Sequence, residues 1–232
     1  MIKSLVIFPT YNEKSNILQI INDVLTHGFE VLVIDDNSPD KTYEIVEKFF
    51  KSNKNVHLIK REEKLGLGSA YREGFSWGLK RNYDYLIEMD ADFSHRVEDL
   101  NKLIQFKDQN KLILGSRYVS DGDIVGWSFR RKLLSKYANK LAKLITSSNV
   151  NDMTSGFRIY PKKILEIINF QFTQNDGYAF QIEMTLLVTK NKFEILEVPI
   201  IFEERRSGKS KLDNQIIREA LKYLLFFRFQ KK

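Results

Sequence analysis

Short apolar runs alternate with stretches of helical periodicity along the first half of the chain. Five runs rich in Val, Ile and Leu predict buried strands over residues 5–8, 31–34, 56–59, 85–89 and 111–114. Between them, apolar residues three or four positions apart predict helices over 17–25, 43–50, 69–79 and 99–106. This order predicts an α/β fold with a mostly parallel, doubly wound sheet and helices on both faces. The second half is less regular and contains no repeat, so we interpret it as completing the same domain.

Acidic residues follow the predicted strands, where a sheet of this kind binds its ligands. Asp90 and Asp92 come directly after the run over 85–89, and in an extended segment two such residues point to the same side. Hard oxygen ligands suit Mg²⁺ or Mn²⁺, which keep coordination positions open for phosphate oxygens. An isolated Asp-x-Asp is more often a solvated turn, but a crevice shared with Asp35, Asp36 and Asp40 favours a metal site.

The loops after the second and third predicted strands contain candidate nucleoside ligands. Asp35 and Asp36 end the second strand, where a carboxylate accepts hydrogen bonds from ribose hydroxyls or base N–H groups. The alternative is a helix cap, a role that fits Ser38 or Asp40 better. Gly66-x-Gly68 lacks the third glycine of a dinucleotide fingerprint, and no Gly-Lys-Ser/Thr is present. We therefore disfavour a nicotinamide enzyme or a P-loop NTPase and expect these glycines to let backbone and a nucleoside approach closely.

The composition narrows the class of protein. The chain has 232 residues, 37 Lys and Arg against 30 Asp and Glu, a net charge of +7 and no cysteine. A disulfide scaffold, a thiolate metal site and a cysteine nucleophile are therefore excluded. No run reaches the roughly 18 to 20 apolar residues of a membrane-spanning helix, and residues 2–7 show no signal-peptide pattern. We expect a cytoplasmic protein with an acidic partner: nucleic acid, a phosphorylated substrate or an anionic lipid surface.

The positive charge is concentrated in residues 129–145, which carry six Lys and Arg and no acid. The apolar residues of this segment fall near helical spacing, which predicts an amphipathic basic helix. Two interpretations are open: a helix packed on the core with a solvated back, or an interfacial helix attracted to an anionic lipid surface. Residues 216–232 form a second segment of the same kind.

Several motifs resemble those of glycosyltransferase family 2, in the family's order and over about residues 5–225. They are Pro9-Thr10-Tyr11-Asn12-Glu13, Asp35-Asp36-x-Ser38-x-Asp40-x-Thr42, Lys64-x-Gly66-x-Gly68, Met89-Asp90-Ala91-Asp92-x-Ser94-His95, Gly115-Ser116-Arg117-Tyr118 and Asp152-x-Thr154-Ser155-Gly156-Phe157-Arg158. Three later motifs are similar to those of its dolichyl-phosphate (polyprenol-phosphate) mannosyltransferase branch: Gly126-Trp127 with Arg130-Arg131-Lys132-x-x-Ser135, Gly177-Tyr178-x-Phe180-Gln181-x-Glu183, and Arg205-x-x-Gly208-x-Ser210-Lys211-Leu212.

This resemblance implies a fold and a reaction. The fold is a single GT-A-type nucleotide-sugar transferase domain over residues 1–211, followed by a basic amphipathic helix over 212–232 that is suited to a membrane surface. The reaction is transfer of mannose with inversion from GDP-mannose to a membrane-embedded polyprenyl (dolichyl) phosphate. The protein is expected to be peripheral, on the cytoplasmic face of a membrane, where some relatives rely on a small membrane subunit.

The resemblance also assigns roles by position. The nucleotide sugar would be held by Pro9, Tyr11, Glu13, Asp36, Asp40, Gly66 and Ala91. Asp90 and Asp92 would hold the metal, with Ser94, where some relatives carry Gln, as a weaker third ligand. Arg117, Arg131 and Ser135 match the acceptor-phosphate positions, and Arg205 and Lys211 match the closing loop. Asp92, Arg117 and Arg131 are the expected catalytic residues.

These residue types suit the implied chemistry. A divalent ion neutralises the charge that develops on a departing diphosphate. A phosphate monoester is already ionised near neutral pH, so its attack requires no base, and arginines bind it while keeping their own charge. Asp176 and Glu183 are then left with a structural or sugar-orienting role, or that of a base.

Two alternatives are kept. One is a family 2 transferase that moves another sugar, glucose or an amino sugar, to a polyprenyl phosphate, or a sugar to a hydroxyl. The other is a nonenzymatic nucleic-acid-binding protein, which the carboxylates Asp35, Asp36, Asp40, Asp90 and Asp92 oppose because they repel a phosphate backbone. We therefore expect no nucleic-acid partner.

Overall fold

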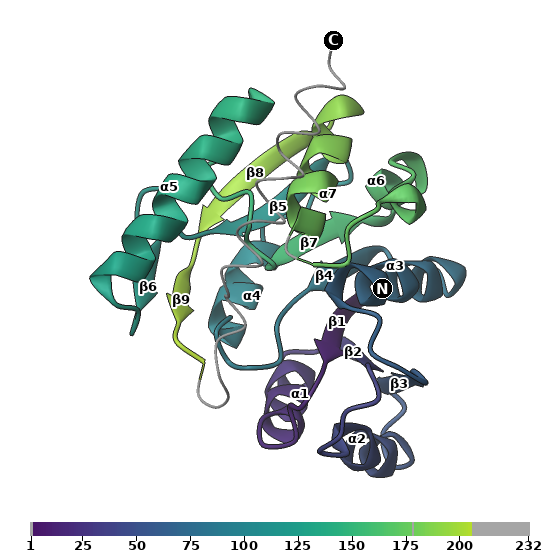
Figure 1. The fold of residues 1–232 in the computed structure, drawn as a ribbon. Helices are drawn as coiled ribbons and strands as arrows, with labels where there is room; N and C mark the ends of the chain where they lie inside the picture. The colour runs from purple at the N-terminus through teal and green to yellow at the C-terminus, as the bar shows by residue number, and fades with distance from the viewer. Residues whose placement is uncertain (1, 178, 206–232) are drawn as a thin grey trace.

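The computed structural model describes residues 2–177 and 179–205. A seven-stranded sheet forms the centre of the fold, in the order β3-β2-β1-β4-β7-β5-β8 (Figure 1). Its strands are β1 (Ser4–Thr10), β2 (Glu30–Asp35), β3 (Val56–Lys60), β4 (Tyr85–Glu88), β5 (Lys111–Ser116), β7 (Arg158–Pro161) and β8 (Glu194–Pro199). All neighbours pair in parallel except β7, which is antiparallel to both β4 and β5. Two short parallel strands, β6 (Asp123–Val125) and β9 (Ile201–Glu203), form a separate ribbon.

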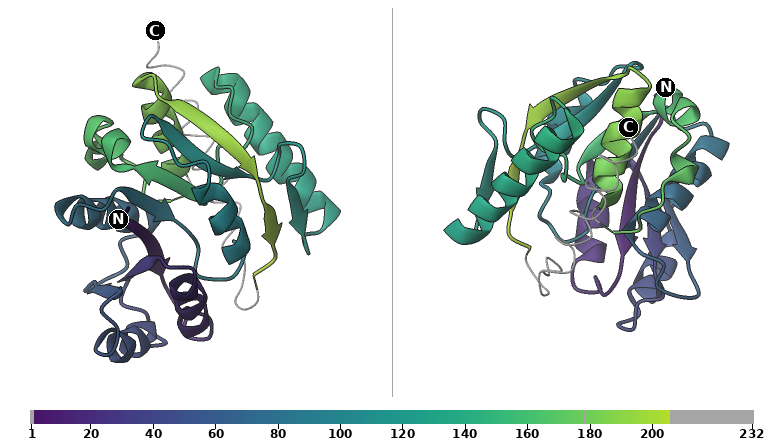
Figure 2. Two further views of the ribbon diagram at one scale, coloured as in Figure 1. Left: turned by 180° about the vertical axis from the view of Figure 1, so that it is seen from behind. Right: turned by 45° about the horizontal axis from the view of Figure 1, so that its top comes forward.

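Helices cover both faces of the sheet, because each central strand is apolar on both sides (Figure 2). On β1, Val6 and Phe8 point to one face, where they pack with α1 (Ile17–Thr26), α2 (Thr42–Phe50) and α4 (Val97–Ile104). Leu5 and Ile7 point to the other face and pack with α3 (Leu67–Lys80), α6 (Lys162–Ile167) and α7 (Ala179–Lys190). A 3₁₀ turn, η1 (Phe170–Phe172), follows α6, and α5 (Phe129–Thr146) runs along the β8 end of the sheet in Figures 1 and 2.

The predicted α/β fold is confirmed, and each strand and helix expected in the first half is present within a few residues of its expected bounds. The second half departs from a purely parallel winding because β7 inserts between β4 and β5. This strand carries a fully buried Arg158 and ends in Pro161, so its sequence lacks the apolar run of a central strand. The expected helix over 212–232 and the last residues of the expected domain over 1–211 lie outside the described residues.

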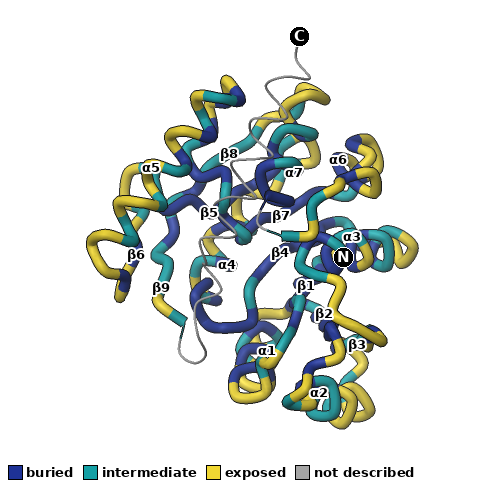
Figure 3. The backbone as a smooth tube through the Cα atoms, in the orientation of Figure 1, coloured by how far each residue is buried: buried dark blue, intermediate teal, exposed yellow. Residues whose placement is uncertain are grey.

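The helix α5 confirms the amphipathic segment predicted over 129–145, and most of its apolar side chains are exposed, although Ile145 packs against a core cluster that includes Ala142. The buried residues of this helix are Asn139, Ala142 and Thr146, which are small or polar. Its exposed apolar residues are Phe129, Leu133, Leu134, Tyr137, Leu141 and Leu144 (Figure 3). The helix therefore packs on the core through a narrow side of mostly small residues, while its wider apolar side is exposed among the described residues. None of the described helices is long and apolar enough to cross a membrane.

Candidate active site

A cavity of about 400 Å³ opens at the carboxyl ends of β1, β2 and β4, where parallel sheets bind their ligands. Of the residues expected from the sequence to bind substrate or metal, eleven line it: Pro9, Glu13, Asp36, Gly66, Asp90, Ala91, Asp92, Ser94, Arg117, Arg131 and Arg205. Three do not line it, namely Tyr11, Asp40 and Ser135. Lys211 lies outside the described residues. The cavity therefore brings the expected acidic and basic residues together from segments more than a hundred positions apart.

The turn after β4 holds two carboxylates and a hydroxyl at the cavity wall. Asp92 is buried, and its Oδ1 accepts the backbone N–H of Ser94 at 3.0 Å, while its Oδ2 lies 3.3 Å from Nη2 of Arg205. Ser94 Oγ is buried without a hydrogen-bond partner among the described residues. A buried hydroxyl without a partner beside two carboxylates matches the hard oxygen donors of Mg²⁺ or Mn²⁺.

His95 holds this turn in place through a hydrogen bond to its backbone. Its Nδ1 accepts the backbone N–H of Asp90 at 3.0 Å, which leaves the ring proton on Nε2. Burial lowers the pKa of His95 to about 4, although Asp92 opposes that shift, so the ring is neutral at physiological pH. Within residues 2–177 and 179–205, no three His, Cys, Asp or Glu side chains are grouped to hold a metal ion. A metal at Asp90 and Asp92 would therefore complete its coordination with hydroxyl, water or substrate oxygens.

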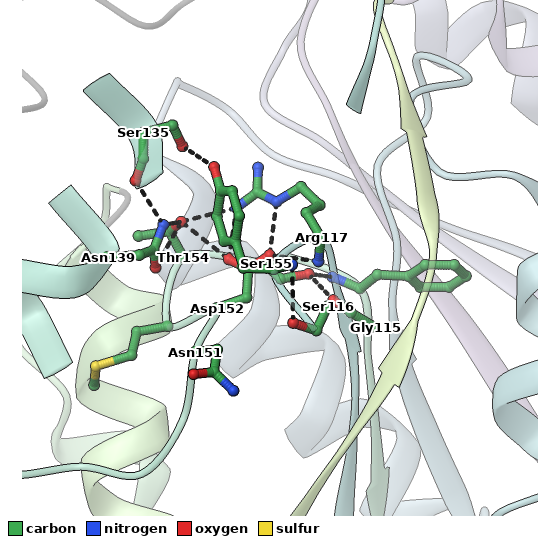
Figure 4. Close-up of polar contacts among 12 residues, drawn as sticks. Gly115, Ser116, Arg117, Ser135, Asn139, Asn151, Asp152, Thr154 and Ser155 are labelled. Carbon is green, nitrogen blue, oxygen red and sulfur yellow. Dashed lines mark hydrogen bonds and ion pairs between the residues drawn. The ribbon is translucent and has the colours of Figure 1, made fainter. Parts of the chain in front are cut away.

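Arg117 is held in a buried ion pair with Asp152 (Figure 4). Its Nε and Nη2 each donate to the carboxylate at 2.7 Å, its backbone N–H donates at 3.0 Å, and Nη2 also donates to Thr154. Burial raises the pKa of Asp152, but the guanidinium outweighs burial and holds this pKa below its usual value. Arg117 therefore remains charged, with the Nε–Nη2 edge of its fork committed to Asp152 rather than available to a phosphate.

Arg131 reaches the cavity from the first turn of α5. The helix begins after Ser128, whose hydroxyl accepts the backbone N–H of Arg131. The Arg131 guanidinium lies 3.7 Å from the centre of the Trp127 ring, and its Nη1 is 3.1 Å from the Glu204 carboxylate. One turn further on, Ser135 Oγ accepts the Tyr118 hydroxyl at 2.7 Å. Ser135 therefore orients Tyr118, and Arg131 is the α5 side chain that lines the cavity.

The acidic residues after β2 play different roles from those expected. Asp35 is completely buried and accepts hydrogen bonds from Thr10 and Ser38, so it does not line the cavity. Asp40 accepts the N–H and hydroxyl of Thr42 at the start of α2, together with the backbone N–H of Lys14. The expectation that Asp35 and Asp40 share the crevice is wrong, because both are used to connect the loops after β1 and β2.

Asp36 lines the cavity and fixes the loop that precedes α3. Its Oδ1 accepts Nη1 of Arg61 at 2.9 Å, and its Oδ2 accepts the backbone N–H of Gly66 at 2.9 Å. Gly66 has a φ of +91°, which glycine adopts without strain. A Cβ on Gly68 would lie 2.2 Å from the carbonyl oxygen of Asn175. The close approach at Gly68 is therefore to the backbone of the chain itself, not to a nucleoside as expected.

The two residues left over as candidate bases both form ion pairs or hydrogen bonds within the protein. Asp176 forms an ion pair with Arg72, and its carbonyl accepts the N–H of Gly68 at 3.0 Å. Glu183 accepts the backbone N–H groups of Gln174 and Asn175 and the Asn175 side chain. Glu183 thus has a structural role at the start of α7, whereas Asp176 lines the cavity with its charge paired.

The cavity also contains residues that no sequence pattern assigned to a site. Phe202 on β9 packs edge-on against Trp127 and His95, at ring distances of 5.6 and 5.3 Å. The short alternating strand around Phe202 carries no signal of a ligand site. Gln181 and Thr154 lie within motifs that were recognised, but only the fold places their side chains at the cavity wall.

The sheet, its acidic strand ends and the basic residues opposite them define a GT-A-type nucleotide-sugar transferase. The chain belongs to glycosyl transferase family 2, because the model of that family matches residues 5–168. It is 41% identical over 223 residues to the polyprenol monophosphomannose synthase of Mycolicibacterium smegmatis, covering 94% of this chain and 84% of that one. It is 39% identical over 220 residues to the undecaprenyl-phosphate mannosyltransferase of Micrococcus luteus, covering 94% and 90%.

The fold is also similar to a solved structure of glucosyl-3-phosphoglycerate synthase from Mycobacterium tuberculosis, in complex with Mn²⁺, UDP-glucose and phosphoglyceric acid. The TM-score is 0.71 at 18% sequence identity, over 97% of this chain and 79% of that chain. At this identity the similarity establishes the fold. Membership of the family makes the protein a glycosyltransferase, as the sequence motifs predict.

Glu88 lies beneath the cavity, at the end of β4. It is completely buried, and neither carboxylate oxygen has a hydrogen-bond partner among the described residues. Burial raises the pKa of Glu88 to about 8, although the Arg158 guanidinium and the Gln181 amide oppose this rise. The native protein therefore holds a proton on Glu88 in a range of pH where the unfolded chain has lost it.

The first prediction concerns this proton. Because the folded-state pKa lies above the ordinary value of 4.5, the stability that the proton contributes is greatest below about pH 4.5 and is lost as the pH rises towards 8. We expect Glu88→Gln to flatten the fall in unfolding free energy over this range, which for one proton amounts to at most about 1.4 kcal/mol per pH unit. Urea unfolding at pH 5, 6, 7 and 8 measures how the unfolding free energy of each protein depends on pH. Glu98→Gln is the control, because that side chain is exposed, and equal slopes in all three proteins would contradict the prediction.

Proposed function

We propose that this protein transfers mannose from GDP-mannose to a polyprenyl phosphate, with inversion at the sugar and with a divalent metal ion. One observation carries the proposal: Asp90 and Asp92 line the same cavity as Arg117 and Arg131. Carboxylates suit the metal of a nucleotide diphosphate, and guanidinium groups suit a second, anionic substrate. The two relatives of about 40% identity, named for polyprenol monophosphomannose and undecaprenyl-phosphate mannose transfer, support the same substrates.

The donor side of the site is the turn after β4. Asp90, Asp92 and the hydroxyl of Ser94 would hold Mg²⁺ or Mn²⁺, and the Mn²⁺ in the related fold supports this choice of ion. Such an ion supplies charge neutralisation on the leaving diphosphate. Arg205 contributes a positive charge from the other side, since its guanidinium already contacts Asp92. Asp36 and Gly66, which also line the cavity, would contact the nucleoside.

The acceptor side needs cations and no base. A phosphate monoester carries about −1.5 to −2 charges near pH 7, so its oxygen attacks without losing a proton. Arg131 and the Nη1 group of Arg117 would orient this phosphate towards the sugar carbon, on the face opposite the diphosphate. His95 does not act as a base, because its Nδ1 already accepts a hydrogen bond and its pKa is lowered. The site therefore favours an ionised phosphate over a sugar hydroxyl as acceptor.

The exposed apolar face of α5 supports a lipid acceptor. Phe129 and Leu144 at the two ends of the helix are 78% and 75% exposed, and the lysines of α5 lie beside this apolar face. A helix with apolar and basic surfaces of this kind binds the headgroup region of an anionic membrane. Because Arg131 lies on the same helix, membrane binding by α5 would bring the cavity to the phosphate of a membrane-embedded acceptor. We accordingly propose a peripheral protein on the cytoplasmic face of a membrane.

The second prediction tests the reaction itself. We expect the purified protein, with Mn²⁺ or Mg²⁺ and a short polyprenyl phosphate, to form polyprenyl-phosphate-mannose from GDP-mannose, as detected by mass analysis of the lipid. EDTA should abolish the product. Asp92→Asn, which removes a charge without changing size, should lower kcat by about 100-fold or more while thermal unfolding is unchanged.

A panel of nucleotide-sugar donors provides the results that would contradict this function. UDP-glucose, GDP-glucose and UDP-N-acetylglucosamine are run beside GDP-mannose under the same conditions. Preferred formation of a glucosyl or amino-sugar lipid would assign the other sugar, and sugar transfer to a free hydroxyl in place of the phosphate would overturn the acceptor. Full activity in EDTA would exclude the metal at Asp90 and Asp92.

The third prediction separates the acceptor from the donor. We expect Arg131→Ala to raise KM for a short, water-soluble polyprenyl phosphate by about 10- to 100-fold, because a charge-assisted contact to the phosphate is lost. The affinity for GDP should be unchanged, since Arg131 lies on the acceptor side. Arg130→Ala is the matched control: this neighbouring arginine is exposed and does not line the cavity. An unchanged KM in Arg131→Ala, or weakened binding of GDP, would contradict the role.

The fourth prediction concerns the α5 surface. We expect the full chain to sediment with vesicles of phosphatidylcholine and phosphatidylglycerol, and more weakly with phosphatidylcholine alone. Replacing Leu134 and Leu144 together with Ser should weaken this binding by about tenfold or more, from the apolar area that is lost. The control replaces Ile167 and Phe172 with Ser, since these are similarly exposed at 45% and 80% but lie elsewhere. Equal vesicle binding by both variants would show that α5 is not the membrane-binding surface.

A further inference from the structure

Gln181 is a buried amide at the cavity wall. It lies in the first turn of α7, its side chain is 1% exposed, and it lines the cavity. Neither its Oε1 nor its Nε2 has a hydrogen-bond partner among the described residues. A buried amide left without partners costs about 1 to 3 kcal/mol, so its presence at the wall of a site requires an explanation.

Gly156 opens the space in front of this amide. A Cβ on Gly156 would lie 3.8 Å from Gln181 Nε2, 3.8 Å from His95 Cε1 and 3.9 Å from Asp90 Oδ1. Because Gly156 has no side chain and itself lines the cavity, the wall stays open beside these three groups. A ligand group that packs against Gly156 would therefore lie near both the Gln181 amide and the carboxylate that we assign to the donor.

The chemistry of this wall selects a neutral hydroxyl group. An amide offers a donor and an acceptor side by side, and a hydroxyl uses both, whereas a phosphate accepts only. The basic residues Arg117 and Arg131 are the groups that suit the phosphate. The transferred hexose carries the hydroxyl groups closest to the leaving diphosphate in a nucleotide sugar.

We propose that Gln181 recognises the sugar of the donor, its amide forming hydrogen bonds with a hydroxyl group of the hexose being transferred. This role rests on the proposed function, because it takes the nucleotide sugar to lie against Asp90 and Asp92. The residue binds and orients the sugar, and as a neutral amide it takes no proton. Gln181 therefore determines donor specificity, while other side chains supply the charged groups of the reaction.

The competing role is purely structural. The Gln181 amide lies close enough to the Glu88 carboxylate to lower its pKa, although Glu88 and the buried hydroxyl of Tyr71 have no hydrogen bond of ordinary length among the described residues. A water molecule shared by these groups and Gln181 would satisfy all of them. In that case Gln181 would maintain the floor of the site, and its loss would affect every donor and the nucleotide alone to the same extent.

The fifth prediction uses Gln181→Met, which keeps the size and removes both hydrogen-bonding atoms. We expect kcat/KM for GDP-mannose to fall by about 10- to 100-fold, because the sugar hydroxyl loses its partners. The affinity for GDP, which has no hexose, should be unchanged. The matched control is Gln174→Met, the same replacement at an exposed position seven residues earlier that does not line the cavity; it should behave as the wild type.

A series of donors identifies the hydroxyl. Wild type and Gln181→Met are compared with GDP-mannose and with its 2-, 3-, 4- and 6-deoxy forms. We expect one deoxy donor to be poor for the wild type and to be used almost as well by the variant, since the contact is already absent. Gln181→Asn, which keeps the amide but shortens the side chain, should show the same pattern more weakly. This variant replaces Gln181→Met in the comparison if Gln181→Met is unstable in thermal unfolding.

Three results would overturn the role. They are an equal loss with all five donors, weakened binding of GDP in the variant, and no loss at all. Failure of the proposed function gives a different result: the wild type itself then fails to use GDP-mannose. If the wild type uses another nucleotide sugar from the donor panel, the deoxy series is made for that sugar, and the same criteria apply to Gln181.

Discussion

The buried ion pair between Arg117 and Asp152 holds the basic side of the cavity in place. It joins the end of β5 to the loop before β7, and both partners are almost completely removed from water. Glu197 on β8 fixes Asp152 in turn, by accepting the backbone N–H groups of Asn151 and Asp152. Loss of one partner would leave an uncompensated buried charge, at a cost of about 3 to 5 kcal/mol. The pair thus presents a permanent cation to the cavity at a fixed position.

The turn after β4 contributes negative charge to the same cavity. Asp90 and Asp92 lie on this turn, His95 supports it as a neutral ring, and Arg205 pairs with Asp92. The rings of Trp127 and Phe202 lie against each other, and Phe202 also contacts His95 beneath this turn. Carboxylates that would hold a cation, together with fixed arginines in one cavity, would let two anionic substrates approach each other, which is the main difficulty of transfer between two phosphates.

Much of the site could be predicted, and the errors are instructive. Asp90 and Asp92 were expected because they follow a strand, and Arg131 because its motif resembles the family's; the structure brings all three to one cavity. Asp40 was also expected there, yet its carboxylate accepts the N–H and hydroxyl of Thr42, because a short acidic side chain after a strand can bind backbone as well as a ligand. The direction of the α5 apolar face was left open, since amphipathic periodicity shows that a helix has two faces and not which of them meets the protein.

The sequence by itself determined the alternation of strands and helices, the acidic strand ends and the basic helix, because each depends on residues near one another in the chain. Only the tertiary structure decided that β7 runs antiparallel between β4 and β5, that Gly68 makes room for Asn175, and that Gln181 faces the cavity without a partner. These features join segments that lie far apart in sequence, and their geometry depends on the packing of the whole sheet. Hydrogen-bond satisfaction in particular is a property of the folded neighbourhood, which no local pattern records.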